Sequence, residues 1–183
     1  MDSFFHRRSS ASAQESGLAT VQAKADRGDA DAQFGLGLRY GNAVGGALDF
    51  VQAASWYRKA ADQGYPLAQY NLGVMFARGQ GVPQDGAASA GWIRKAAEGG
   101  DAGGQHDLGV LCHRASLDPL QAGKVESRIE AYMWLHLAAA QGYKDSAAAW
   151  ERLTITMALT EIAEGNRRAA AFVARKPANP QIS

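Results

Sequence analysis

Several protein classes are excluded by what the sequence lacks. Among its 183 residues there is one cysteine, Cys112, so the chain cannot build a disulfide framework of its own. With 19 Lys and Arg against 18 Asp and Glu, the net charge of +1 lacks the basic excess of a nucleic-acid-binding protein. No apolar run at its start reaches the roughly 7–15 residues of a secretory signal or the roughly 20 of a membrane span. We therefore expect no nucleic-acid partner, no membrane insertion and a cytoplasmic location, or a periplasmic one if an export signal was removed.

What the sequence has in abundance indicates a packed helical chain. Apolar residues make up 46% of the chain and charged residues 20%, a balance typical of globular proteins. The length is sufficient to bury a substantial core. The 21 glycines and the many alanines show no collagen period, so they favour helices that pack through small faces and are separated by glycine turns.

The sequence repeats itself at a spacing of 36 residues. One segment recurs at residues 32–40, 68–76 and 104–112. A second recurs at residues 56–64 and 92–100, and again at 134–142 after a spacing of 42, so six residues are inserted within the third copy. Because several independent positions agree on one register, we interpret the chain as three copies of one structural unit.

Each unit is predicted to be a pair of helices. In the first helix, Ala32, Leu36 and Tyr40 have helical spacing, as do their equivalents in the second copy. A glycine follows the leucine in every copy and costs about 1 kcal/mol inside a helix, so its recurrence predicts a close approach between helices. These glycines are Gly37, Gly73 and Gly109. The second helix carries a recurring tryptophan and ends at a glycine suited to a left-handed cap. Those glycines are Gly64, Gly100 and Gly142.

Aspartates and prolines mark the boundaries of these helices. Four aspartates precede predicted helices and are expected to cap them with their carboxylates: Asp29, Asp49, Asp85 and Asp101. Pro66 lies where a first-turn proline is tolerated. The inserted residues fall within 115–124, where Pro119 and Gly123 predict a loop rather than a longer helix. This insertion either marks a functional face or is a neutral change at the surface.

The register divides the chain into one repeat domain with two tails. The domain spans residues 12–176, with a mobile N-terminal tail at 1–11 and a mobile C-terminal tail at 177–183. Within the domain we predict a cap helix, three repeats and two closing cap helices, at residues 12–28, 29–64, 65–100, 101–142 and 143–176. The cap helices are expected to present one polar face, as the ends of stacked repeats require.

Three motifs give the chain a resemblance to a known family. They are Ala-x-x-x-Leu-Gly-x-x-aromatic at Ala68–Phe76, Gly-x-Gly-Val-x-x-Asp at Gly79–Asp85, and Trp-Tyr-x-Lys-Ala-Ala-x-x-Gly at Trp56–Gly64. With them the chain resembles the Sel-1-like repeat family, a branch of the tetratricopeptide-type α-solenoids. The resemblance implies an all-α, right-handed α-α superhelix of three helix pairs, and a protein-interaction adaptor of bacterial signalling, envelope or secretion assemblies. The family's cysteine-rich branch, linked to β-lactam binding, is not supported because this chain has no paired cysteines.

Catalytic and metal-binding spacings are missing. The sequence contains no Ser-x-x-Lys, Gly-x-Ser-x-Gly or His-Glu-x-x-His motif. His106 and His113 are separated by roughly 10.5 Å along a helix, which is too far for the two to chelate one metal ion. Cys112 takes the position of core aromatic residues in the earlier copies, and His136 takes the position of arginines expected at the surface. We therefore predict no catalytic residue, no metal, no cofactor and no enzymatic activity.

The candidate binding residues lie beside the core positions of the first helices. In solenoids of this type the first helices line the concave surface. The neighbouring face holds, over the three copies, Phe34, Leu38, Asn42, Tyr70, Val74, Arg78, His106, Val110, His113 and Arg114. Stacking the copies aligns an aromatic row and a polar row, and aromatic residues and arginines tend to dominate interface energies. The alternative for the aromatic residues is packing between adjacent helices.

We expect the chain to bind a protein or peptide segment in this concave groove. Two alternatives stay open. One is a small-molecule-binding or hydrolytic protein that uses the histidine-lined end of the groove, and the other is a structural subunit that self-associates through its end helices. We favour a monomer over the self-associating form.

Overall fold

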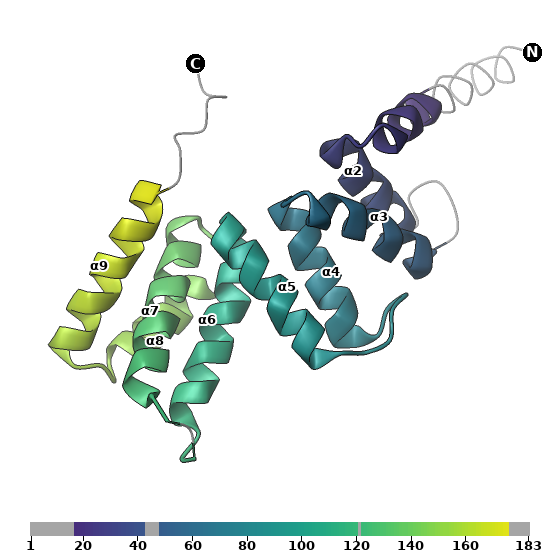
Figure 1. Cartoon of the computed structure of the whole chain (residues 1–183). Helices are drawn as coiled ribbons and strands as arrows, with labels where there is room; N and C mark the ends of the chain where they lie inside the picture. The colour runs from purple at the N-terminus through teal and green to yellow at the C-terminus, as the bar shows by residue number, and fades with distance from the viewer. Residues whose placement is uncertain (1–16, 43–47, 121, 176–183) are drawn as a thin grey trace, which may run out of the picture. The chain divides into compact units, whose positions relative to one another are not determined.

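The computed structural model describes residues 17–42, 48–120 and 122–175, and every regular element in these ranges is an α-helix (Figure 1). The helix nearest the N-terminus spans residues 17–26 and precedes the first repeat. The others are α2 (Ala30–Gly41), α3 (Phe50–Asp62), α4 (Pro66–Arg78), α5 (Gly86–Gly99), α6 (Ala102–Leu117), α7 (Lys124–Ala140), α8 (Ser146–Thr154) and α9 (Leu159–Arg175). The predicted all-α fold class is confirmed. The predicted tails at 1–11 and 177–183, and the start of the cap helix at 12–16, lie outside the described residues.

The chain divides into two compact units, Met1–Trp92 and Ile93–Ser183, and the division falls inside α5. In the first unit, α3 packs against both α2 and α4. In the second unit, α7 is the central helix and contacts α6, α8 and α9 (Figure 1). Each unit therefore has a core of its own.

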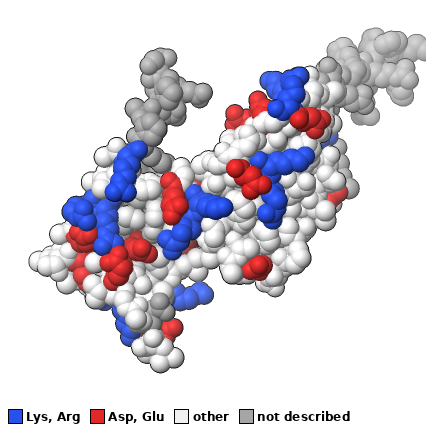
Figure 2. Space-filling model, viewed as in Figure 1, with Lys and Arg blue, Asp and Glu red and all other residues white. Residues whose placement is uncertain are grey.

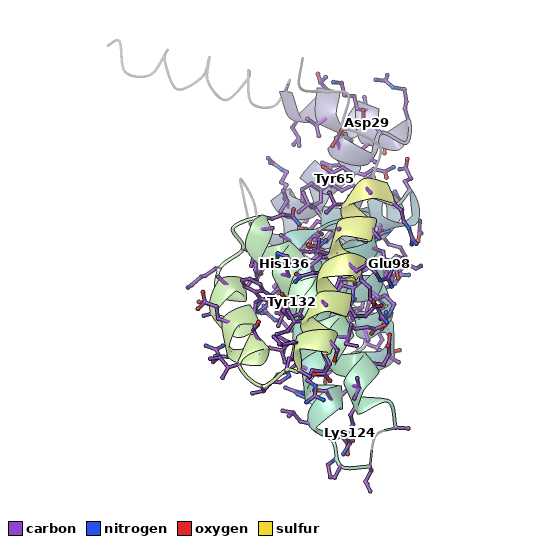
Figure 3. All side chains as sticks on the ribbon, turned by 90° about the vertical axis from the view of Figure 1, so that its left-hand side faces the viewer. Asp29, Tyr65, Glu98, Lys124, Tyr132 and His136 are labelled. Carbon is purple, nitrogen blue, oxygen red and sulfur yellow. The ribbon has the colours of Figure 1, made fainter. Side chains whose placement is uncertain are left out.

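The two cores are built from the recurring apolar positions. In the first unit, Leu36 and Leu72 are buried. In the second unit, Tyr132 is buried and reaches both closing helices (Figure 3). Its ring centroid lies 5.7 Å from that of Trp150 on α8, and its hydroxyl donates to Oδ1 of Asn166 on α9 at 3.1 Å. One tyrosine thus holds three helices together.

The predicted aspartate caps are confirmed. The carboxylates of Asp29, Asp49 and Asp101 accept hydrogen bonds from the backbone N–H three residues further on, at 2.8, 3.0 and 2.7 Å. Asp85 accepts from two backbone N–H groups at 2.9 and 3.0 Å. Each bond satisfies an N–H that the helix itself leaves unpaired. The second helices end, as predicted, at glycines with positive φ: Gly64, Gly100 and Gly142.

Two of the glycines predicted to allow close helix packing do so. A Cβ added to Gly37 would lie 2.5 Å from ring atoms of Tyr57 on α3. A Cβ added to Gly109 would lie 2.8 Å from Cγ of Leu135 on α7. Both contacts are shorter than side chains tolerate, so the first helix of a repeat lies against the second at a distance that only glycine permits.

A buried glutamine that recurs every 36 residues joins each first helix to the helix before it. The three glutamines are Gln33, Gln69 and Gln105. Each donates from its side-chain amide to the backbone carbonyl eight residues earlier, at 2.9, 3.1 and 3.3 Å. These carbonyls lie in the last turn of the preceding helix, where no intrahelical donor four residues on is available. The amide oxygens of Gln33 and Gln105 also accept from Gln63 and Gln141, at 2.7 and 2.8 Å.

The predicted loop is present around Pro119 and Gly123 but is shorter than 115–124, because the insertion also lengthens the two flanking helices. In the repeat register, α6 ends at Leu117, three residues later than α4, and α7 begins at Lys124, four residues earlier than α5. Alanine and leucine are strong helix formers, so α6 continues past its counterpart. It stops only where Asp118 adopts an extended backbone before Pro119, as the residue before a proline prefers.

Candidate functional site

The ten side chains predicted to form a groove are distributed over both units. Six lie in the first unit: Phe34, Leu38, Asn42, Tyr70, Val74 and Arg78. Four lie in the second: His106, Val110, His113 and Arg114. The first set lies on α2 and α4 or at their ends, and the second set lies on α6.

In the first unit the predicted residues range from half-buried to exposed. The ring of Phe34 packs between helices, with centroids 5.1 Å from Tyr65 and 5.8 Å from Tyr57. Tyr70, like Leu38 and Val74, is half-buried on its helix. Asn42 and Arg78 are exposed at the ends of α2 and α4. A partner could therefore reach the ends of these helices more easily than Phe34.

In the second unit the two histidines are half-buried and differ in their surroundings. Nδ1 of His106 lies 2.8 Å from Oγ of Ser146, and its ring centroid lies 5.3 Å from that of Tyr143. His106 thus contacts the start of α8. Nδ1 of His113 is buried and has no hydrogen-bond partner among the described residues. Val110 and Arg114 are exposed on the same helix.

His136 is half-buried rather than exposed at the surface as predicted. Its ring stacks on that of Trp150, with centroids 4.9 Å apart and an interplanar angle of 11°, and its Nδ1 is buried. The reason is that α8 packs against α7 and carries Trp150 over this position. In the earlier copies the position is taken by arginines, and Arg58 covers the rings of two later aromatic residues.

The described residues do not form a metal-binding cluster. Within them no three His, Cys, Asp or Glu side chains come together as ligands. Cys112 is buried, as its core position predicted, and donates to Oε2 of Glu130 at 3.4 Å. Burial, aided by the Glu130 carboxylate, raises the pKa of this thiol to about 12, so it is protonated and unreactive at neutral pH. No helix in the described ranges has both the length and the apolarity to cross a membrane.

One cavity in the second unit was missed by reasoning from the sequence. It is lined by residues of α5, α7 and α9, which are second helices of the repeats or lie beyond them. A signal for it exists at the recurring tryptophan of the third copy. Leu137 follows Trp134 by three residues, whereas the earlier copies have Lys59 and Lys95 there. The third tryptophan therefore has no lysine of its own repeat to cover it.

The repeated helix pairs, joined by buried glutamines and packed through glycines, define a helical-repeat protein. The Sel1 repeat family matches the chain in three consecutive segments, at residues 30–65, 66–101 and 102–143. The chain therefore belongs to the Sel1 repeat family, whose members are generally protein-interaction or scaffold modules.

Two solved structures resemble this fold, and both are of bacterial proteins. A Sel1 repeat protein from Oxalobacter formigenes is 34% identical, with a TM-score of 0.63 over 74% of this chain and 98% of the other. The c5321 protein, a protective antigen of uropathogenic Escherichia coli strains with an SLR fold, is 35% identical, with a TM-score of 0.64 over 82% of this chain. This chain spans 32% of the length of c5321. No curated protein matches the sequence. The predicted family and solenoid fold class are confirmed.

Proposed function

We propose that this chain is an adaptor whose first helices each bind a segment of a partner protein on their exposed face. The general role of Sel1 repeat proteins in protein interaction supports this class of function. The observation that carries the proposal is a ring, a valine and an arginine at four-residue spacing in two successive repeats. On α4 they are Tyr70, Val74 and Arg78, and on α6 they are His106, Val110 and Arg114.

The chemistry of these two triplets suits a peptide that carries both apolar and acidic side chains. Residues four and eight positions apart stay close to one face of a helix, and the triplet spans about 12 Å along its axis. The half-buried rings offer apolar contact together with the valines, of which Val74 is half-buried and Val110 is exposed, while the exposed arginine can pair with a carboxylate in a two-point hydrogen bond. An extended or helical segment of a partner presents such groups at matching intervals.

Affinity capture followed by titration tests the proposal. The full chain serves as bait in extract of the native cell, and a retained protein is then purified and titrated against variants. Tyr70→Ala/Arg78→Ala should weaken its binding at least about tenfold, because aromatic and arginine anchors each contribute about 1 kcal/mol or more. Arg27→Ala is the matched control, since Arg27 is exposed and lies outside the first helices.

Two further measurements separate a loss of partner binding from a loss of folding. Circular dichroism must show intact helicity for each variant, because Tyr70 is half-buried. Arg78→Ala alone, at an exposed position, should weaken binding without altering the fold. Unchanged affinity of both variants for every captured protein would contradict the proposal.

A further inference from the structure

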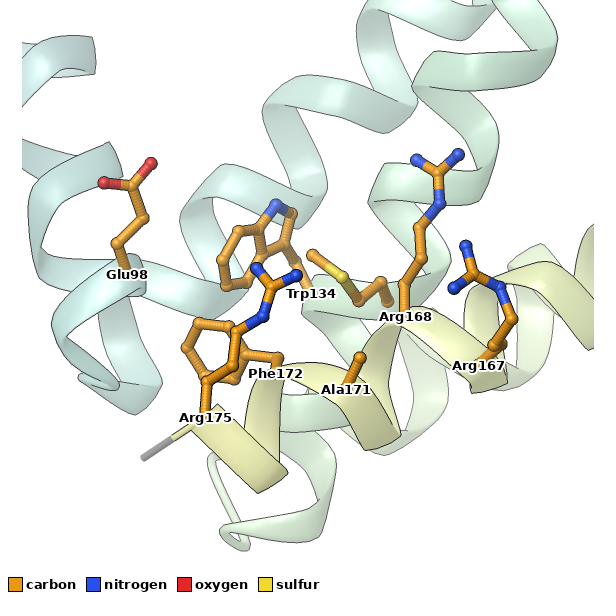
Figure 4. Close-up of a pocket in the computed structure, with 8 residues that line it drawn as sticks. Glu98, Trp134, Arg167, Arg168, Ala171, Phe172 and Arg175 are labelled. Carbon is orange, nitrogen blue, oxygen red and sulfur yellow. The ribbon is translucent and has the colours of Figure 1, made fainter. Parts of the chain in front are cut away.

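The second unit contains a cavity of about 580 Å³ (Figure 4). This size is within the roughly 300–1,000 Å³ typical of ligand-binding pockets. Eight residues line it: Glu98, Met133, Trp134, Arg167, Arg168, Ala171, Phe172 and Arg175. They come from α5, α7 and α9, whereas the proposed binding face is on α4 and α6.

The floor of the cavity is apolar and aromatic. Trp134 is buried and meets the half-buried Phe172 edge to face, with ring centroids 5.3 Å apart and an interplanar angle of 77°. Met133 and Ala171 complete the apolar lining. In the first repeat, by contrast, Nζ of Lys59 lies 3.7 Å from the ring centroid of the equivalent tryptophan. The floor around Trp134 can therefore accept an apolar side chain from outside.

The rim carries three arginines, but two of them are already paired. Arg167 donates to Glu164 through Nε and Nη2, both at 2.7 Å. Arg168 donates to Glu164 at 2.7 Å and forms a two-point pair with Glu126 on α7. Figure 2 shows the resulting mixture of basic and acidic side chains over α9. These two guanidinium groups are neutralised by their own carboxylates.

Arg175 differs from the other two, since it has no ion pair among the described residues. It is exposed at the end of α9 and lines the cavity together with Trp134 (Figure 4). Glu98, from α5, lines the cavity as well. The cavity thus offers one arginine without an ion pair among the described residues, an aromatic floor and one negative group.

We propose that this cavity binds a peptide segment of a partner protein in which one carboxylate lies next to a large apolar side chain. Arg175 pairs with the carboxylate, and the apolar side chain packs on Trp134 and Phe172. The count of charges decides against phosphates and nucleic acids, because one free arginine matches a single negative charge and Glu98 repels a polyanion. Arginine and aromatic residues are also the types most enriched where proteins bind tightly.

This site goes beyond the proposed function, because its residues lie on α5, α7 and α9 and not on the first helices α4 and α6. If both are occupied, the chain can hold two partners and bring them together. The two proposals can fail independently, since their residues lie on different helices.

A dye-labelled peptide tests the cavity directly. The probe has Glu-Leu-Phe at the centre of a Gly and Ser background, and its binding to the full chain is followed by fluorescence anisotropy. Replacing its Glu by Gln, or its Leu and Phe by Ala, should each weaken binding at least about tenfold, as expected for the loss of a charge-assisted bond or an apolar anchor. Equal binding of all three peptides would overturn the proposal.

Variants of the protein locate the bound peptide. Ala171→Trp fills the cavity and should weaken binding at least about tenfold, whereas Ala170→Trp, at the exposed neighbouring position, should not. Arg175→Glu should also weaken peptide binding. Arg152→Glu, which changes the charge equally at an exposed site outside the cavity, should not. Helicity by circular dichroism confirms that each variant is folded.

Three outcomes would overturn the assignment. The first is equal binding by Ala171→Trp and Ala170→Trp. The second is displacement of the peptide by inorganic phosphate or ATP at lower concentration than by unlabelled peptide, which would indicate an anion site. Tyr70→Ala/Arg78→Ala should bind the probe like the wild type, so a loss there would place the peptide on the first-helix face instead.

Discussion

At Gly37 the first helix of a repeat lies so close to the second that only a hydrogen atom fits. The nearest ring atoms of Tyr57 lie 2.5 Å from the position that a Cβ would take. Gly35, on the same helix, has nothing within 4 Å of its own Cβ position. The two glycines therefore allow the cost of a clash to be separated from the effect of helix propensity.

Replacing these glycines by alanine should have opposite effects on stability. Gly37→Ala is expected to lower the free energy of unfolding by about 1–3 kcal/mol, because overpacking against Tyr57 outweighs the gain in helix propensity. Gly35→Ala should raise it by up to about 1 kcal/mol, because only the propensity changes. Urea unfolding followed by circular dichroism measures both, and equal effects of the two changes would contradict the packing argument.

Single residues could be predicted from the sequence where their role is local. The aspartate caps depend only on the residues that follow them, and the repeated glycines showed their packing role by recurring in register. His136 was placed wrongly because its partner, Trp150, comes from a closing helix outside the repeats. The buried glutamines also recurred in register, yet their bonds run to backbone carbonyls that no sequence pattern marks.

At the scale of helices, charged side chains tie α9 to α7. Arg168 of α9 pairs with Glu126 of α7, and Arg128 of α7 pairs with Glu161 of α9 at 2.9 Å. Glu161 also accepts from the backbone N–H of Ala158 at 2.8 Å and so caps α9. The hydrogen bonds from Arg167 and Arg168 lower the pKa of Glu164 to about 2. Several coupled charges thus position the last helix.

Acid should weaken this attachment in a defined range of pH. The Glu164 carboxyl has a pKa of about 2 in the folded protein and a usual value of about 4.3 when unfolded. Its contribution to stability is therefore complete above about pH 5 and is lost as the pH falls from about 4.3 towards 2. We expect the stability difference between wild type and Glu164→Gln to be constant above that range and to vanish at its acidic end.

Urea unfolding of both proteins at a series of pH values measures this difference. Because Glu164 is solvent-accessible, added salt should reduce the difference at neutral pH. A difference that stays constant down to about pH 2 would show that Glu164 does not titrate as its arginine partners require.

Helix positions were the part of the fold that the repeat register predicted best. Four capping aspartates and three closing glycines marked most boundaries correctly. The exception was the insertion, where Pro119 and Gly123 predicted a loop over 115–124 and the loop between α6 and α7 is shorter. The preceding Ala and Leu residues continue α6 instead, because a proline stops a helix only at the residue before it.

For the whole molecule, the two compact units should respond separately to a local change. In a repeat protein each repeat contacts only its neighbouring repeats, so the free energy of unfolding is close to a sum of local contributions. The division inside α5 places α2, α3 and α4 in one unit and α6 to α9 in the other. The division could not be read from the register, and of the cavity the register marks only the missing lysine beside Trp134, since the α9 residues that line it lie outside the repeats.

Hydrogen exchange can test this separation. Gly37→Ala should reduce amide protection in α2, α3 and α4 more than in α6, α7, α8 and α9, because the disturbed contact lies in the first unit. Exchange resolved by mass spectrometry of peptic fragments gives both values for one sample. A uniform loss of protection over all these helices would show instead that the chain unfolds as one cooperative body.

The recurring glutamine has a consequence for how such a chain can change in length. Each copy brings its own donor, and the end of each copy supplies the acceptor for the next, at 2.9, 3.1 and 3.3 Å in the three junctions. A duplicated stretch of 36 residues would therefore carry both the glutamine donor for the preceding repeat and the carbonyl acceptor for the following one. Gene duplication or deletion can therefore add or remove whole repeats while the hydrogen bond between adjacent repeats is kept.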